Sequence, residues 1–81
     1  MTDVLRARVF SVVAATLKID PSTVTEELSA GDVPAWDSLG HVTLLQALEQ
    51  EFALTFDIDD ALAIEGVADM LTVLSRLAPA E

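Results

Sequence analysis

The stretch Trp36–Phe52, WDSLGHVTLLQALEQEF, joins a polar start to an apolar pattern of helical spacing. On a helix, the face of this segment opposite its apolar residues would include Gly40, Thr43 and Gln46, and it has no charged residue. We expect a helix over residues 38–52 that packs its apolar face against a core. Side chains three or four residues apart share one face of an α-helix. The apolar face of this helix consists of Leu39, Val42, Leu45, Leu48 and Phe52, and Leu44 widens it.

Three other segments show helical spacing of apolar residues. We expect helices over residues 2–17, over residues 57–63, and from about Gly66 to a stop before Pro79. The short third helix is expected to turn its apolar side chains inward; these are Ile58, Leu62 and Ile64. The last helix is expected to bury Val67, Met70, Leu71, Leu74 and Leu77.

A long connection separates the first two helices. Pro21 disfavours helical backbone in Asp20 before it and so ends the first helix. Loops of this length are usually tied to the body of a compact domain, and the apolar anchors available here are Ile19, Val24, Leu28 and Val33. The predicted fold is all-α: one domain over residues 1–81, forming a four-helix bundle with three longer helices and a short third one.

The charge distribution limits the possible partners. The net charge is −10, and no Lys or Arg lies between Asp20 and Asp69, a stretch that holds all but two of the fourteen acidic residues. Such a field repels nucleic acid and anionic lipid, and it attracts a protein with a basic docking surface. The acidity could also serve solubility alone.

Composition excludes further classes of function. The chain has no cysteine, so disulfides, thiolate chemistry and zinc–sulfur sites are ruled out. No apolar run approaches the ~18 residues of a membrane span, and the start does not resemble a secretory signal. We expect a monomeric, cytoplasmic protein.

Ser38 has three possible roles at the start of the predicted second helix. It, or Asp37, could cap the helix by accepting a backbone N–H. It could be a nucleophile with Asp37 and His41, although catalytic triads usually draw their members from separate elements and no Gly-x-Ser-x-Gly elbow is present. It could also be an attachment point, because the positive end of a helix favours a bound phosphate.

The residues around Ser38 resemble the acyl carrier proteins. Asp37-Ser38-Leu39 stands at the start of the helix as the family signature does, and the helix ends in Ala47-Leu48-Glu49-Gln50-Glu51-Phe52, similar to the family's ALEEEF-like end. Ile19-Asp20-Pro21 is similar to the turn after the family's first helix, and residues 56–67 are similar to its short third helix. The resemblance therefore covers nearly the whole chain.

The resemblance implies a carrier protein rather than an enzyme. Ser38 would receive the 4'-phosphopantetheine arm of coenzyme A from a phosphopantetheinyl transferase, and Asp37 would help the transferase orient the serine or its magnesium ion. The thiol of the arm would hold an acyl or aminoacyl group as a thioester and present it to a loading enzyme, synthase or transferase. Leu39 would be an apolar contact for these enzymes, or else part of the core.

The departures from the family pattern bear on the pathway. Carriers of fatty acid synthesis usually have acids along the exposed face after the serine, where this chain has Gly40, Thr43 and Gln46. Trp36 before Asp-Ser and Gly40-His41 after Leu39 are more similar to stand-alone carriers of polyketide and related specialised pathways. The alternatives are a housekeeping fatty acid carrier and an unmodified acidic helical adaptor. The predicted partner-binding residues are Trp36, Leu39, Thr43, Gln46, Glu49, Asp57, Asp59 and Asp60.

Two of these features also have plainer interpretations. Trp36 is expected to be half-buried against the second helix. Asp57, Asp59 and Asp60 are spaced almost like the start of a calcium loop, but such a loop would need an acid at Ala61, a glycine at Leu62 and a glutamate at Ala68. We therefore expect a solvated acidic face and no metal site.

Overall fold

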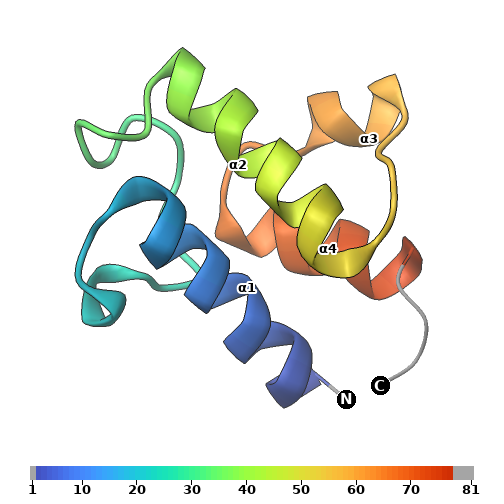
Figure 1. Cartoon of the computed structure of the whole chain (residues 1–81), viewed down its shortest axis with the longest axis horizontal. Helices are drawn as coiled ribbons and strands as arrows, with labels where there is room; N and C mark the ends of the chain where they lie inside the picture. The colour runs from blue at the N-terminus through green and yellow to red at the C-terminus, as the bar shows by residue number, and fades with distance from the viewer. Residues whose placement is uncertain (1, 78–81) are drawn as a thin grey trace.

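The computed structural model describes residues 2–77, which are all-α (Figure 1). Within that range no strand is present, and the regular elements are α1 (Thr2–Leu17), the 3-10 turn η1 (Pro21–Thr23), α2 (Ser38–Phe52), α3 (Ile58–Ala63) and α4 (Val67–Leu77). The predicted four helices are confirmed, with bounds that agree to within a residue or two. The turn η1 was not predicted, and the predicted stop at Pro79 lies outside the described residues.

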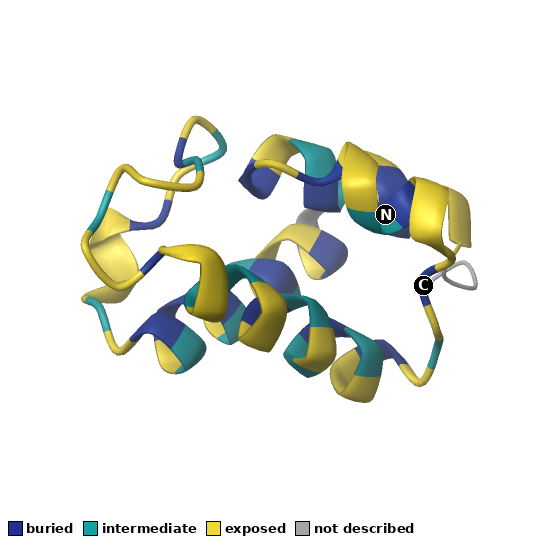
Figure 2. Ribbon diagram, turned by 90° about the horizontal axis from the view of Figure 1, so that it is seen from above, coloured by how far each residue is buried: buried dark blue, intermediate teal, exposed yellow. Residues whose placement is uncertain are grey.

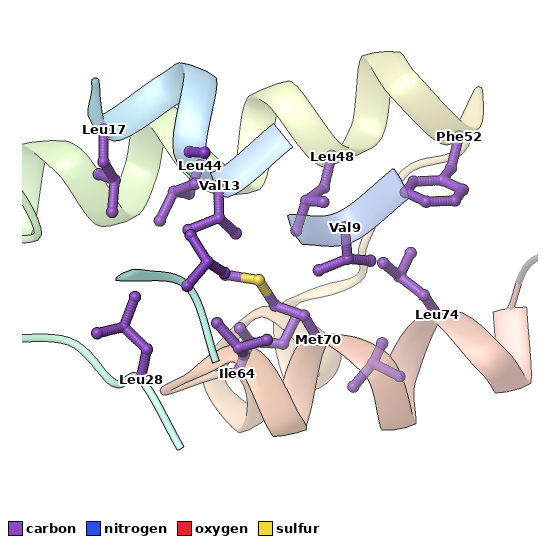
Figure 3. Packing of buried hydrophobic residues seen from close by; sticks show 14 of the residues in the cluster. Val9, Val13, Leu17, Leu28, Leu44, Leu48, Phe52, Ile64, Met70 and Leu74 are labelled. Atoms are coloured by element: carbon purple, nitrogen blue, oxygen red, sulfur yellow. The ribbon is translucent and has the colours of Figure 1, made fainter. Parts of the chain in front are cut away.

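One apolar core lies between α1, α2 and α4. Helix α1 packs against both α2 and α4, and the inward sides of the helices are buried while their outward sides are exposed (Figure 2). Burying a large apolar side chain contributes roughly 1.5–3 kcal/mol. Figure 3 shows the side chains that meet between the three helices, among them Val9 and Val13 from α1, Leu44 and Leu48 from α2, and Met70 and Leu74 from α4.

The helix ends follow local backbone chemistry. The carboxylate of Asp37 accepts the Gly40 N–H at 2.8 Å and caps the start of α2, and Asp57 caps α3 in the same way through the Asp60 N–H. At the other end of α2, Ala53 adopts a left-handed backbone with φ 54°, and its N–H bonds the Glu49 carbonyl. Such left-handed residues commonly end helices.

The long connection is tied to the core and to the start of α4. Val24 and Leu28 are buried, as predicted, whereas Ile19 and Val33 are only partly buried. The Val67 N–H donates to the Leu28 carbonyl at 2.9 Å, beside an isolated β-bridge between residues 29 and 66. These bonds hold the connection beside the junction of α3 and α4.

The turn η1 lies early in this connection and depends on Asp20. The Asp20 carboxylate accepts both the backbone N–H of Ser22, at 2.9 Å, and its hydroxyl, at 2.7 Å. Both bonds favour the charged carboxylate, and they lower the pKa of Asp20. Pro21 at the first position of the turn has a fixed φ that suits it.

Five side chains of the apolar faces predicted for α2, α3 and α4 are exposed. One of them is Leu39, for which the sequence also allowed a partner contact, and another is Leu77 at the end of α4, which is 37% exposed although it was expected to be buried. Leu39 and Val42 of α2 are 75% and 51% exposed, and Ile58 and Leu62 of α3 are 75% and 71% exposed. The inner face of α2 follows the four-residue interval of Leu44, Leu48 and Phe52, which turns Leu39 and Val42 outward. In α3 the buried residue is Asp60. The inward orientation predicted for Ile58 and Leu62 is therefore wrong, while that of Ile64 is confirmed.

None of the helices in residues 2–77 has the length and apolar character needed to cross a bilayer.

Candidate functional site at the start of helix α2

Ser38 is the first residue of α2 and is exposed. The capping bond at this helix start comes from Asp37, whose Oδ1 accepts the Gly40 N–H at 2.8 Å. Within residues 2–77 the Ser38 hydroxyl has no hydrogen-bond partner. The first two residues of the signature therefore have separate local roles: Asp37 stabilises the helix, and Ser38 presents a free hydroxyl to solvent.

A close backbone contact fixes the approach to this helix start. A Cβ at position 40 would collide with the carbonyl oxygen of Ala35, so only glycine fits here without a shift of the backbone. Just before α2, the Trp36 N–H donates to the Val33 carbonyl at 3.0 Å, and the Trp36 carbonyl accepts the Gly31 N–H at 2.9 Å. From the sequence, Gly40 was an uncharged position of the outer helix face and part of the family resemblance, and no steric role was predicted for it. The glycine is visible in the sequence, but its contact with the Ala35 carbonyl depends on the tertiary fold.

Trp36 and His41 form a pair beneath the first turn of α2. Trp36 is 1% exposed, so the half-buried position predicted for it is wrong, and its indole is not available on the surface for a partner. The indole Nε1–H donates to His41 Nδ1 at 2.9 Å, and the two rings are nearly parallel with centroids 6.2 Å apart. The sequence does not predict this pair, because its only trace there is that the single Trp and the single His lie five residues apart.

This arrangement does not assemble a catalytic triad. No hydrogen bond links Ser38 to His41 within the described part of the chain, and Trp36 already donates to His41 Nδ1. The Asp37 carboxylate is bonded to its own helix rather than to the imidazole. An activated serine needs a base within hydrogen-bond reach that is itself oriented by a third group, and these residues do not provide that arrangement.

An open depression of about 500 Å³ lies beside Ser38. Trp36, Ser38 and His41 line it from α2 and the residues just before it, while Gly31 and Ile64 line it from the long connection and the segment between α3 and α4. The Ala30 N–H bonds the Glu65 carbonyl at 3.0 Å and joins the last two segments. The depression thus brings together three parts of the chain that are distant in sequence.

The surface of α2 beyond Ser38 is neutral and partly apolar. Leu39, Val42, Thr43 and Gln46 are all exposed. The Thr43 hydroxyl donates to the Leu39 carbonyl at 2.9 Å, one turn earlier, so Thr43 is held close to its own helix. The predicted partner residues of α2 therefore share a solvent-facing surface, with the exception of Glu49. That residue is half-buried, and its carboxylate accepts the Phe56 N–H at 2.8 Å.

The acids of α3 do not form the uniformly solvated face that was predicted. Asp57 and Asp59 are exposed, and Asp57 caps the helix. Asp60, however, is 8% exposed, and its carboxylate meets the guanidinium of Arg76 at 2.6 Å. This bond and the negative charge of Asp60 raise the pKa of Arg76. The placement of Asp60 on a solvated partner-binding surface is thus corrected, because its carboxylate joins α3 to α4.

In residues 2–77, no group of three or more His, Cys, Asp or Glu side chains is arranged to hold a metal ion. A comparison of the sequence with models of known protein families finds no match. The local geometry around Ser38 and the sequence motif therefore carry the functional proposal.

Proposed function

We propose that this protein is a carrier of the acyl carrier type, which holds a 4'-phosphopantetheine arm on Ser38. One observation carries the proposal: Ser38 opens a fifteen-residue helix with an exposed hydroxyl that has no partner within residues 2–77. A serine needed only for stability would be expected to cap the helix, and Asp37 does that here.

The residues present fit the attachment reaction. In it the Ser38 hydroxyl loses its proton to a base of the transferase, and Oγ forms a bond to the phosphorus of coenzyme A nearest the pantetheine. The pyrophosphate bond breaks and 3',5'-adenosine bisphosphate leaves. The product is a phosphodiester at the positive end of α2, where the first-turn N–H groups favour negative charge.

The attached group supplies a thiol that holds acyl or aminoacyl units as thioesters, which the cysteine-free chain cannot do by itself. The chain's own contribution is to position this group. Asp37 orders the helix start, and Gly40 lets the preceding backbone pack closely beneath it. The core between α1, α2 and α4 provides a rigid base.

The surface beside Ser38 supports a specialised pathway, such as polyketide assembly, over housekeeping fatty acid synthesis. Leu39, Val42, Thr43 and Gln46 offer neutral contacts, while Asp57 and Asp59 add negative charge on α3. A loading enzyme, synthase or transferase that docks here would need an apolar contact surface with basic groups at its edge. The same surface would also serve an adaptor that is never modified, so the test must separate these two functions.

The test is enzymatic attachment followed by intact-mass measurement. Wild-type protein is incubated with coenzyme A, Mg²⁺ and a broad-specificity phosphopantetheinyl transferase. We expect one added phosphopantetheine on wild type, one on Ser11→Ala, which removes an exposed serine of α1, and none on Ser38→Ala. Circular dichroism checks that all three proteins fold. A folded wild type that stays unmodified would favour the adaptor and contradict the carrier proposal.

Asp37 can be tested separately for its two roles. Asp37→Asn keeps an oxygen that can cap α2, whereas Asp37→Ala loses the cap and about 1 kcal/mol of stability. If the carboxylate helps the transferase, Asp37→Asn is modified more slowly than wild type although it is nearly as stable. Equal rates for Asp37→Asn and wild type would leave Asp37 with the capping role alone.

A further inference from the structure

We propose that the depression beside Ser38 seats the first segment of the prosthetic arm, and that Trp36 fixes His41 as a hydrogen-bond donor within it. This inference rests on the proposed carrier function. It assigns to His41 the role of a positioning residue, which binds the arm and takes no part in the transfer chemistry. The observations that carry it are the Trp36–His41 bond and the place of both residues in the wall of the depression.

The bond from Trp36 determines where the His41 ring holds its proton. An indole nitrogen can only donate a hydrogen bond, so Nδ1 of His41 must accept it through a lone pair. A neutral imidazole has one N–H, which must then be at Nε2. The 2.9 Å bond and the near-parallel arrangement of the rings, with 20° between their planes, define one orientation of the imidazole.

Trp36 is itself firmly held and can impose that orientation. Its side chain is buried in the core cluster, and its backbone N–H and carbonyl are both bonded within the turn of residues 31–36. His41 is half-buried, and within residues 2–77 no partner is bonded to its Nε2. The Nε2–H of His41 is therefore a free donor, on a ring whose other nitrogen is held by Trp36.

That donor lies on the same side of α2 as the attachment point. His41 follows Ser38 by three residues, a spacing that places two side chains on one helix face, and both line the depression. The far wall is braced by the Ala30–Glu65 backbone bond. A volume of about 500 Å³ lies in the range of small-molecule sites, although this one is open to solvent.

The lining indicates which part of the arm would be held. Beyond its phosphate, a pantetheine arm has two methyl groups on one carbon, a hydroxyl and two amides. Ala30 is exposed and offers apolar contact to the methyl groups, and the His41 Nε2–H can donate to a hydroxyl or amide oxygen. Asp37 and Glu65 at the same depression would repel phosphate oxygens. We therefore assign to His41 a neutral oxygen of the arm rather than the phosphate.

The first experiment examines the protein before attachment. Nitrogen NMR of labelled protein, at a pH where imidazoles are neutral, distinguishes a ring nitrogen that bears hydrogen from one that does not. We expect wild-type His41 to have its hydrogen on Nε2, and Trp36→Phe to give a mixture of the two neutral forms. Wild-type protein with the hydrogen on Nδ1, or with a mixture like that of Trp36→Phe, would overturn the proposal.

The second experiment compares protein with and without the arm. We expect attachment to shift the His41 Nε2 signal and the amide signals of residues 30, 31, 64 and 65. Two variants separate the nitrogens of His41. In His41→Asn the side-chain oxygen can still accept from Trp36 but no donor remains at the Nε2 position, whereas His41→Gln places an amide donor near that position.

NMR relaxation of an isotope-labelled arm then gives the decisive comparison. We expect the arm to become several-fold more mobile in His41→Asn and to regain most of its restriction in His41→Gln. An arm equally mobile in wild type and His41→Asn, or wild-type shifts confined to Ser38 and its chain neighbours, would overturn the inference and leave the carrier function intact. A wild type that takes up no arm would overturn both.

Discussion

The carboxylate of Asp37 accepts the Gly40 N–H at 2.8 Å, and the neighbouring hydroxyl of Ser38 has no partner within residues 2–77. A serine in the capping position would have turned its own oxygen toward the backbone. Here the capping residue stands one position earlier, so the helix start is stabilised without using the hydroxyl. This one-residue offset makes Ser38 available for chemistry.

Gly40→Ala is expected to destabilise the protein. Alanine in place of glycine inside a helix normally stabilises by about 1 kcal/mol, but here the new methyl group would collide with the Ala35 carbonyl. Forced overpacking of this kind costs roughly 1–3 kcal/mol. Urea unfolding measures the change, with Gln46→Ala on the exposed face of α2 as the control. A Gly40→Ala protein as stable as wild type would show that the backbone can yield at this point.

Helix α2 presents two kinds of apolar residue. Leu44, Leu48 and Phe52 are buried at intervals of four, whereas Leu39 and Val42 face solvent near Ser38. Both sets have helical spacing, so the pattern alone did not separate core residues from surface residues. The exposed pair is available to a partner without loss of core packing.

A matched pair of leucines tests this division. Leu44→Ala should cost about 2–5 kcal/mol, because it leaves a cavity in the core, whereas Leu39→Ala should lie within about 0.5 kcal/mol of wild type. Both changes remove the same atoms from the same helix, so helix propensity cancels in the comparison. Chemical denaturation gives both free energies, and similar losses for the two variants would contradict the packing described here.

Helix α3 is held to the molecule by a charged contact. Its buried residue is Asp60, which bonds Arg76 of α4 at 2.6 Å, while Ile58 and Leu62 point outward. Short elements with few buried apolar contacts open more readily than the core. The flanking residues Phe56 and Ile64 are buried and limit how far α3 can move.

Arg76→Gln is expected to loosen α3 selectively. It leaves the buried carboxylate of Asp60 without its cationic partner, so amide hydrogen exchange over residues 58–63 should become faster while exchange in α1 changes little. Arg6→Gln, which breaks the exposed 3.1 Å pair with Glu26, is the control and should leave α3 unchanged. Adding Asp60→Asn to Arg76→Gln should restore part of the protection. Uniform acceleration across all helices would instead indicate global destabilisation.

In the molecule as a whole, negatively charged residues far outnumber positively charged ones. The chain has fourteen acidic and four basic residues, and ion pairs join Arg6 to Glu26, Arg8 to Glu51 and Arg76 to Asp60. The described chain is nevertheless compact, with a radius of gyration of 11.4 Å. Repulsion between this many negative charges in a small volume opposes the compact state.

Sodium chloride is expected to raise the Tm. Between about 0.01 and 0.15 M salt the screening length falls from roughly 30 to 8 Å, which weakens the repulsion between acids. A gain of about 1 kcal/mol corresponds to a rise of about 4–8 °C in a domain of this size. Calorimetry measures the change, and the double variant Asp59→Lys, Glu65→Lys, at two exposed acids, should show a weaker salt dependence. A Tm that falls with salt would mean that the ion pairs outweigh the repulsion.

The sequence by itself determined the helix positions, the all-α class and the candidate serine, because caps, proline and helical spacing act over a few residues. Only the tertiary structure decided which apolar residues are inside. It turned Leu39, Val42, Ile58 and Leu62 outward and buried Asp60. It also set Ala35 against Gly40 and Trp36 against His41. These outcomes depend on how each helix is rotated against its neighbours, and that rotation follows from packing between segments that are distant in the chain.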